Sequence, residues 1–223
     1  MTPRFRLFGA ALLCAALCGC PDGGSNAAGE GPKGPASTDA APEAGSAGPL
    51  STGVGGTSPE DCFLRMKAAN DAKDWGAYHD LLTKASQDAM LPTLSFLGGA
   101  MSQGDEAAGK AYAAILTTHG LENLSGEQAP DVSRGGGEMN DLFKDVKDRK
   151  QLFADLMGFA IARRDQMGDT DTVQGIEGIT VDGDEARAQI VAVDAKGKEL
   201  RDPARFRKVD GRWFAEIDMQ SGR

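Results

Sequence analysis

Histidine and cysteine are scarce in this chain of 223 residues, which holds only His79, His119 and four cysteines. The spacings typical of transition-metal sites, such as His-Glu-x-x-His and Cys-x-x-Cys, do not occur. Three of the cysteines lie within the first 20 residues, so Cys62 alone remains for a mature domain and no internal disulfide framework is expected. We therefore expect no metal site and no cofactor, and we interpret Cys62 as a small buried side chain.

Basic residues are also fewer than acidic residues. Lys and Arg number 24 against 33 Asp and Glu, which leaves a formal net charge of -9. Nucleic-acid binding requires a basic surface, so this balance excludes nucleic acid as a partner. The acidic clusters at 169–171 and 182–185 lack the ligand spacing of a calcium loop and are typical of turns. No phosphate-binding loop and no Gly-x-Ser-x-Gly sequence is present.

Long apolar runs are absent after residue 20, where no stretch approaches the roughly 18 residues expected of a membrane-spanning helix. A shorter apolar run, Leu12 to Leu17, follows Arg4 and Arg6 and ends in Leu17-Cys18-Gly19-Cys20. That order is typical of a secretory signal with a cleavage site of small residues. We therefore expect residues 1–19 to be a signal peptide.

The residues Leu17-Cys18-Gly19-Cys20 resemble the lipobox of bacterial lipoproteins, in which Leu, a small residue, Gly or Ala, and Cys follow one another. Cys18 departs from the commonest second residue of that motif. The resemblance implies cleavage before Cys20, thioether lipidation of its sulfur and acylation of the new amine. The protein would then be lipid-anchored to a membrane through Cys20 and extracytoplasmic, either periplasmic or on the cell surface.

The acidic domain would depend on that lipid to stay at a membrane. Removing residues 1–19 takes away Arg4 and Arg6 and no acid, which moves the net charge from -9 to -11. Anionic headgroups repel such a domain, so lipid insertion rather than a basic patch must hold it there.

Residues 20–57 consist mainly of Gly, Ala, Pro and Ser. Leu50 and Val54 are the only large aliphatic residues in this stretch. Such a composition buries too little apolar surface to offset the entropy of ordering the chain. We expect Cys20 to be followed by a disordered linker, and residues 58–223 to form one domain.

Capping residues divide the first part of this domain into helices. Each cap is a Ser or Asp that precedes an apolar repeat of helical period. The expected caps are Ser58, Asp74, Asp105 and Asp148, and Ser86 is expected to restart the pattern after the second helix.

The remaining helical boundaries follow from periodicity alone. The pattern of the second helix continues from Trp75 to Ala85. Pro92 is expected to kink or restart the third helix, and Gly98-Gly99 to weaken it. A loop over 122–138 precedes a long helical stretch from about 139 to 167.

From Val173 onward the apolar period changes from 3.6 to 2, which predicts four strands. Turns at 182–184, 196–197 and 210–211 separate them, and Pro203 is expected to break or start the third strand. The pattern favours an antiparallel meander with one buried face. The fold class is therefore α+β, with an N-terminal helical layer packed on a C-terminal antiparallel sheet.

Two stretches of this domain resemble nuclear-transport-factor-2-like domains. Residues 73–83 look like the start of their second helix, and residues 206–214 look like their closing hairpin. The resemblance implies a helical layer on a strongly curved sheet that encloses an apolar pocket. The pocket would be lined by Tyr78, Tyr112, His79, Trp75, Phe153 and Trp213. The middle, 86–167, departs from the family because it carries additional helix and lacks an evident strand after the second helix.

Three functions agree with these observations. We favour a ligand-binding or protein-interaction module of the cell envelope, whose partner is a small apolar ligand or an envelope protein. Members of the resembled family also include dehydratase- and isomerase-like enzymes, but no spacing here assembles a catalytic group and no catalytic residue is named. The third function is that of a purely structural envelope protein.

Overall fold

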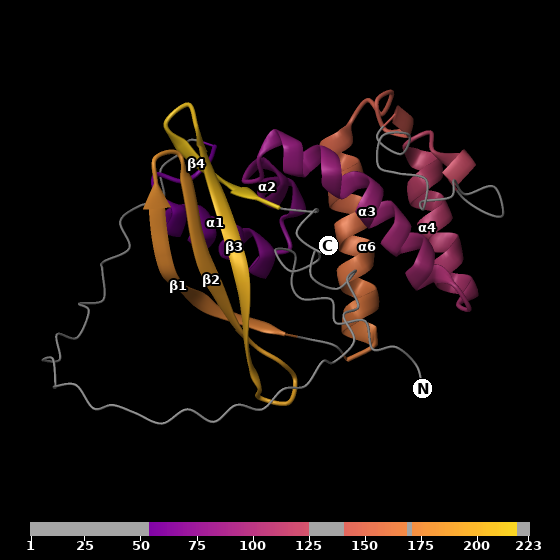
Figure 1. The fold of residues 1–223 in the computed structure, drawn as a ribbon. Coiled ribbons are helices and arrows are strands. Elements are labelled where there is room, and N and C mark those ends of the chain that lie inside the picture. Colours follow the sequence, from indigo (N-terminus) through magenta and orange to yellow (C-terminus); the bar gives the residue numbers. More distant parts are fainter. Residues whose placement is uncertain (1–53, 125–140, 169–170, 218–223) are drawn as a thin grey trace, which may run out of the picture.

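The computed structural model describes residues 54–124, 141–168 and 171–217, and its elements are shown in Figure 1. The helices are α1 (Pro59–Asp71), α2 (Trp75–Asp80), α3 (Lys84–Ser102), α4 (Glu106–Thr118) and α6 (Arg149–Gln166), with a short 3-10 helix η2 (Glu122–Leu124) after α4. The strands are β1 (Thr172–Asp182), β2 (Glu185–Val193), β3 (Glu199–Val209) and β4 (Arg212–Glu216). This arrangement of helices followed by one antiparallel sheet confirms the α+β class.

The helix starts follow the capping pattern of the sequence. Ser58, Asp74, Asp105 and Asp148 each accept a hydrogen bond from the backbone N–H three residues later, so all four predicted caps are confirmed. The pattern that was expected to restart at Ser86 belongs to α3, which begins two residues earlier, at Lys84, and is capped by the side chain of Thr83.

The second helix is shorter than predicted and ends at Asp80. The chain leaves the helix there because Leu82 forms an isolated parallel bridge with Ala215 of β4. A backbone committed to that pairing is unable to continue as a helix, whatever the periodicity of its side chains. Pro92 neither breaks nor restarts the next helix, since α3 runs through it and through Gly98-Gly99.

The long helix predicted from 139 to 167 is also corrected. In the described part of this stretch, Asp141 and Leu142 are helical, turns follow them, and α6 begins at Arg149. Phe143 and Val146 are buried in the core although they precede the helix. Their helical spacing therefore reflects shared burial and not a continuous helix.

The sheet is an antiparallel meander with the order β1-β2-β3-β4, as predicted. Pro203 lies inside β3, opposite Gln189, rather than at its start. β4 pairs with β3 only as far as Arg205, so Pro203 sits where β3 has lost its second neighbour. Proline is tolerated at such an open edge because no ladder hydrogen bond is required of it there.

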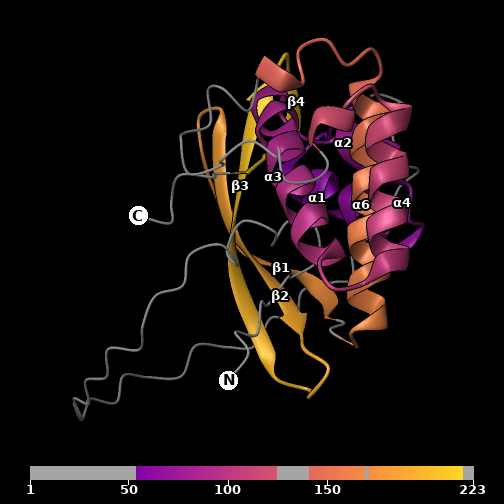
Figure 2. The same cartoon turned by 90° about the vertical axis from the view of Figure 1, so that its right-hand side faces the viewer.

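Figure 2 shows the helices on one side of the sheet, and Figure 1 shows α1 behind the strands with α3, α4 and α6 beside them. α1 contacts β1 and β4, and α6 contacts α2, α3 and α4. The buried side chains form one core that includes both Trp75 and Trp213. The helical part therefore extends sideways beyond the sheet, since α4 and α6 pack on other helices.

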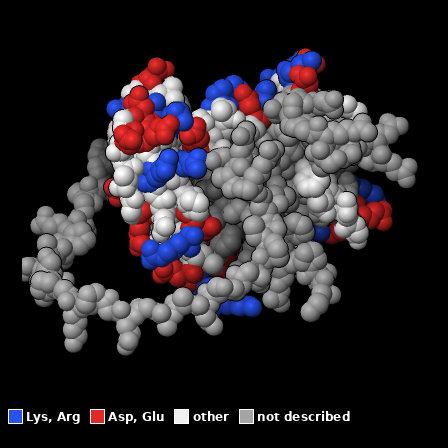
Figure 3. Space-filling model, viewed as in Figure 1, with Lys and Arg blue, Asp and Glu red and all other residues white. Residues whose placement is uncertain are grey.

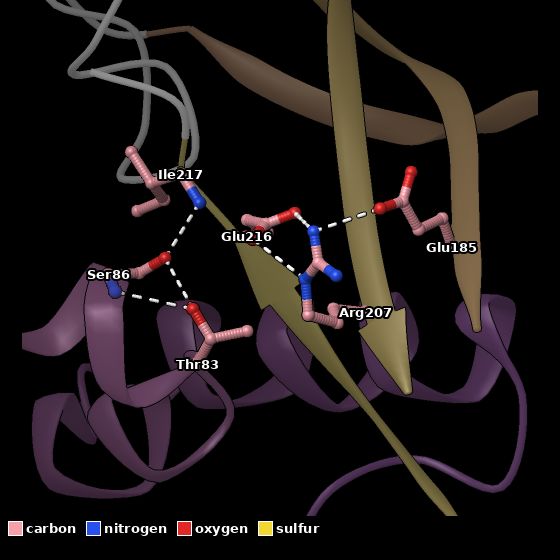
Figure 4. Close-up of polar contacts among 6 residues, drawn as sticks. All are labelled: Thr83, Ser86, Glu185, Arg207, Glu216 and Ile217. Carbon is pink, nitrogen blue, oxygen red and sulfur yellow. Dashed lines mark hydrogen bonds and ion pairs between the residues drawn. The ribbon is translucent and has the colours of Figure 1, made fainter. Parts of the chain in front are cut away.

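The outer edge of β4 is paired by three other segments of the chain. Gly56 and Trp213 exchange two backbone hydrogen bonds of 2.8 Å. Ala215 donates its N–H to Leu81 O and accepts from Thr83 N, both at 2.9 Å. Farther along, Ile217 N donates to Ser86 Oγ at 2.8 Å, and Ser86 Oγ lies 2.8 Å from Thr83 Oγ1 (Figure 4).

The pairing at Gly56 begins two residues before the expected domain start at Ser58 and leaves no room for a side chain. A Cβ atom built on Gly56 would lie 2.4 Å from Cys62 N and 2.7 Å from Cys62 Cα, which are backbone atoms held by α1. Glycine is thus required here for close backbone approach.

We predict that Gly56→Ala destabilises the domain by about 1–3 kcal/mol, because a backbone clash forces α1 away from β4. Gly175→Ala on β1 is the matched control, since a Cβ atom added there would meet no other atom within 4 Å. Chemical denaturation of both variants measures the difference. Equal midpoints for the two would contradict a tight Gly56 contact.

Trp213→Ala is predicted to cost about 3–5 kcal/mol, as truncation of a buried aromatic residue does. Trp213 is only 5 % exposed, so the change opens a cavity between β4 and α1. Val181→Ala on β1, where the side chain is 52 % exposed, should cost well under about 1 kcal/mol. Urea titration separates these outcomes, and an unchanged midpoint for Trp213→Ala would show that the ring contributes little to the core.

Candidate functional site

Four of the six residues expected to line a pocket meet in the structure. Trp75, Tyr78 and His79 of α2 face Phe153 of α6, and all four are more than nine-tenths buried. The Trp75 ring meets the Tyr78 ring edge-on at 6.3 Å between centroids, and Tyr78 stacks on Phe153 at 6.5 Å. His79 meets Phe153 at 5.0 Å in a T-shaped contact. These distances are those of packed aromatic pairs, so the four side chains fill space and form part of the core.

Tyr112 and Trp213 lie in other parts of the same core. The Tyr112 hydroxyl donates to Ser95 O at 2.6 Å, and a Cβ on Gly98 would come within 2.5 Å of the Tyr112 ring. Burial raises the pKa of Tyr112 to about 12, so the phenol stays protonated and holds α4 against α3. Trp213 packs from β4, as described above.

His79 is a buried base with an incomplete set of hydrogen bonds. Its Nδ1 lies 3.6 Å from Asp80 Oδ1, too far for a hydrogen bond, and no other described atom bonds to it. Burial lowers the pKa of His79 below its usual value of 6.5, and the Asp80 carboxylate opposes that shift only in part. The ring is therefore neutral at pH 7 and serves as an aromatic packing group.

Cys62 is fully buried, as the sequence suggested, and burial raises the pKa of its thiol to about 12. Such a thiol is not a nucleophile at neutral pH. No group of three or more His, Cys, Asp or Glu side chains within 54–124, 141–168 and 171–217 is placed to hold a metal ion. In those same ranges no helix combines the length and apolarity needed to cross a membrane. The lipobox and Cys20 lie outside the described residues.

Asp202 is the one carboxyl group of β3 on the helix-facing side of the sheet, where it pairs in register with the buried Ile190. Its Oδ2 is buried without a hydrogen bond to any described atom. Burial raises the pKa of Asp202, and the nearby Asp171 carboxylate raises it further. Asp202 thus costs stability while it is ionised and binds a proton more readily than a free aspartate does.

A hollow of about 340 Å3 lies elsewhere, between the N-terminal segment, α3 and the β3–β4 hairpin. Its walls are Val54, Asp80, Leu82, Thr83, Lys84, Gln87, Val209 and Phe214. None of the six expected pocket residues borders it. Its polar side chains are already engaged: Asp80 with Lys150, Lys84 with Asp88, and Gln87 with two backbone carbonyls. The hollow therefore offers apolar contact but few groups that would orient a ligand.

The face of the sheet that points away from the helices is strongly charged (Figure 3). Arg201 binds Glu177 at 2.7 Å and Glu199 at 2.8 Å. Arg207 binds Glu185 at 3.0 Å and Glu216 at 2.9 Å, which ties β2, β3 and β4 together (Figure 4). We refer to this outer surface of β1 to β4 as the convex face.

These arginines carry no motif in the sequence that marks them as functional residues. Arg201, Arg205 and Arg207 alternate with inward-facing residues on β3, and this period of 2 was a usable signal that the three share a face. Their partners on β2 and β4 depend on strand register, which periodicity alone does not supply.

We predict that low pH destabilises the domain through His79. The folded-state pKa lies below 6.5, so the unfolded chain binds the proton more readily and stability falls as the pH drops from above 6.5 through the folded pKa. His79→Gln removes this contribution and leaves His119 in place. Thermal melts of both proteins from pH 8 to pH 5 should show their difference narrowing as the pH falls, whereas a constant difference would contradict the prediction.

The chain was compared with known protein families, curated proteins and solved structures. No family model, no curated protein and no solved structure matches it.

Proposed function

We propose that this protein is a lipid-anchored, extracytoplasmic lipoprotein whose acidic domain acts as an interaction module of the cell envelope. The observation that carries the proposal is the order of two arginines, a short apolar run and Leu17-Cys18-Gly19-Cys20 at the start of the chain. The Gly-, Ala- and Pro-rich stretch that follows Cys20 suits a tether between lipid and domain.

A module that acts through its surface agrees best with the packing of the domain. Trp75, Tyr78, His79 and Phe153 contact each other and are buried, which supports a filled core in the place where a lined pocket was expected. The charged convex face offers many side chains to a protein partner. A helical layer on one side of an antiparallel sheet is also compatible with a nuclear-transport-factor-2-like arrangement, which stays part of this proposal.

The proposal predicts that the mature protein begins at Cys20 and carries acyl mass. Intact mass spectrometry of the membrane fraction measures both properties. Cys20→Ala should leave an uncleaved precursor or a soluble product, because the acceptor sulfur is gone. Cys18→Ala is the matched control and should be processed normally, since a small residue is retained at the second lipobox position. An unmodified protein that begins elsewhere would overturn the proposal.

A further inference from the structure

The N-terminal segment of the domain meets the outer edge of β4 at Gly56 and has to leave that edge before it. Gly56 exchanges two backbone hydrogen bonds with Trp213 in an antiparallel bridge. If this ladder continued, Val54 would come opposite Ala215. The N–H and C=O groups of Ala215 are already bonded to the segment 81–83, so the place is taken. The chain therefore turns away from β4 at Val54, which forms one wall of the hollow described above.

The hollow leaves large apolar side chains in contact with water. Val54 is 60 % exposed and Val209 is 43 % exposed, although both border the hollow together with the ring of Phe214. Covering such surface is favourable by about 25 cal/mol for each Å2 removed from water. The polar side chains of the walls already have partners within the protein. An occupant that brings apolar atoms and no unpaired polar group therefore gains the most here.

The sequence places one side chain of this kind next to the hollow. Leu50 is the only large apolar residue between Pro21 and Gly53, and it precedes Val54 by four residues. Four residues span at most about 14 Å when fully extended, and a turn at Gly53 would shorten that distance. Leu50 is thus within reach of the hollow, and its attachment to the domain gives it a local concentration in the millimolar range or above.

We propose that Leu50 docks in this hollow and covers Val54, Val209 and Phe214. A leucine side chain needs no orienting hydrogen bond, which suits walls whose polar groups are engaged. The inference goes beyond the proposed function and does not require a lipid on the chain. Its consequence under the proposed lipid anchor is geometric: the tether ends at residue 49 instead of residue 57, beside the β3–β4 hairpin.

Methyl NMR tests this docking in the full chain, held in nonionic detergent and labelled with 13C at the methyl groups of Leu and Val. A nuclear Overhauser contact is expected between Leu50 and Val209, and Leu50→Ala should abolish it. Urea denaturation gives a second readout. Leu50→Ser should lower the midpoint by about 0.5 M, because the variant leaves the hollow uncovered. Leu50→Met should retain the parent midpoint, and so should the neighbouring control Ser51→Ala.

Three results would overturn the inference. The first is no contact between Leu50 and Val209 together with an unchanged midpoint for Leu50→Ser. The second is a contact that persists when the Leu and Val labels are on different molecules, which would assign the hollow to a second copy of the chain. The third is a contact of Val209 with detergent alkyl chains in place of Leu50, which would assign it to an apolar ligand. None of these results affects the mass of the Cys20 species, so a failure here is distinguishable from a failure of the proposed lipid anchoring.

Discussion

The pairing along the outer edge of β4 is the constraint on which the rest of this domain depends. A strand at the end of a meander normally exposes a row of unpaired N–H and C=O groups. In this protein Trp213, Ala215 and Ile217 find their partners in Gly56, in the segment from Leu81 to Thr83, and in Ser86. Gly56 precedes α1, and the other partners lie between the end of α2 and the first turn of α3, so one short strand holds both ends of the first helical pair to the sheet.

This edge also explains the layered packing of the helices. Because Leu82 is committed to β4, the chain must stop α2 at Asp80 and begin α3 at Lys84. The two helices then diverge, and α6 packs against both of them. As a result, the rings of Tyr78 and His79 on α2 pack against the ring of Phe153 on α6. Trp75, Tyr78 and His79, which were expected to line a pocket, therefore pack against each other and Phe153 in the core.

Much of this architecture could be read from the sequence because it is local. A capping Ser or Asp acts within three residues, and a strand period of 2 is visible along the strand itself. The interruption at Leu82 could not be read this way, because its cause is a hydrogen bond to Ala215, more than a hundred residues later. The same holds for Glu185 and Glu216, which lie beside Arg207 only once the register of β3 with β2 and β4 is set. Sequence could not separate a pocket lining from a filled core for a related reason: aromatic residues that line a cavity and those that fill one share the same helical spacing.

The two faces of the sheet contribute differently to the stability of the fold. The helix-facing side contributes Ala186, Ile190 and Phe206 to the core, where burial stabilises the fold. The convex face contributes little burial, and its exposed ion pairs, such as Arg201 with Glu177 and Arg207 with Glu185, add little to stability. Under the proposed lipid anchor the demand on affinity is also modest, because confinement to one membrane raises the effective concentration of a partner held there. A module anchored in this way can act through weak surface contacts, because the membrane would already keep such a partner close.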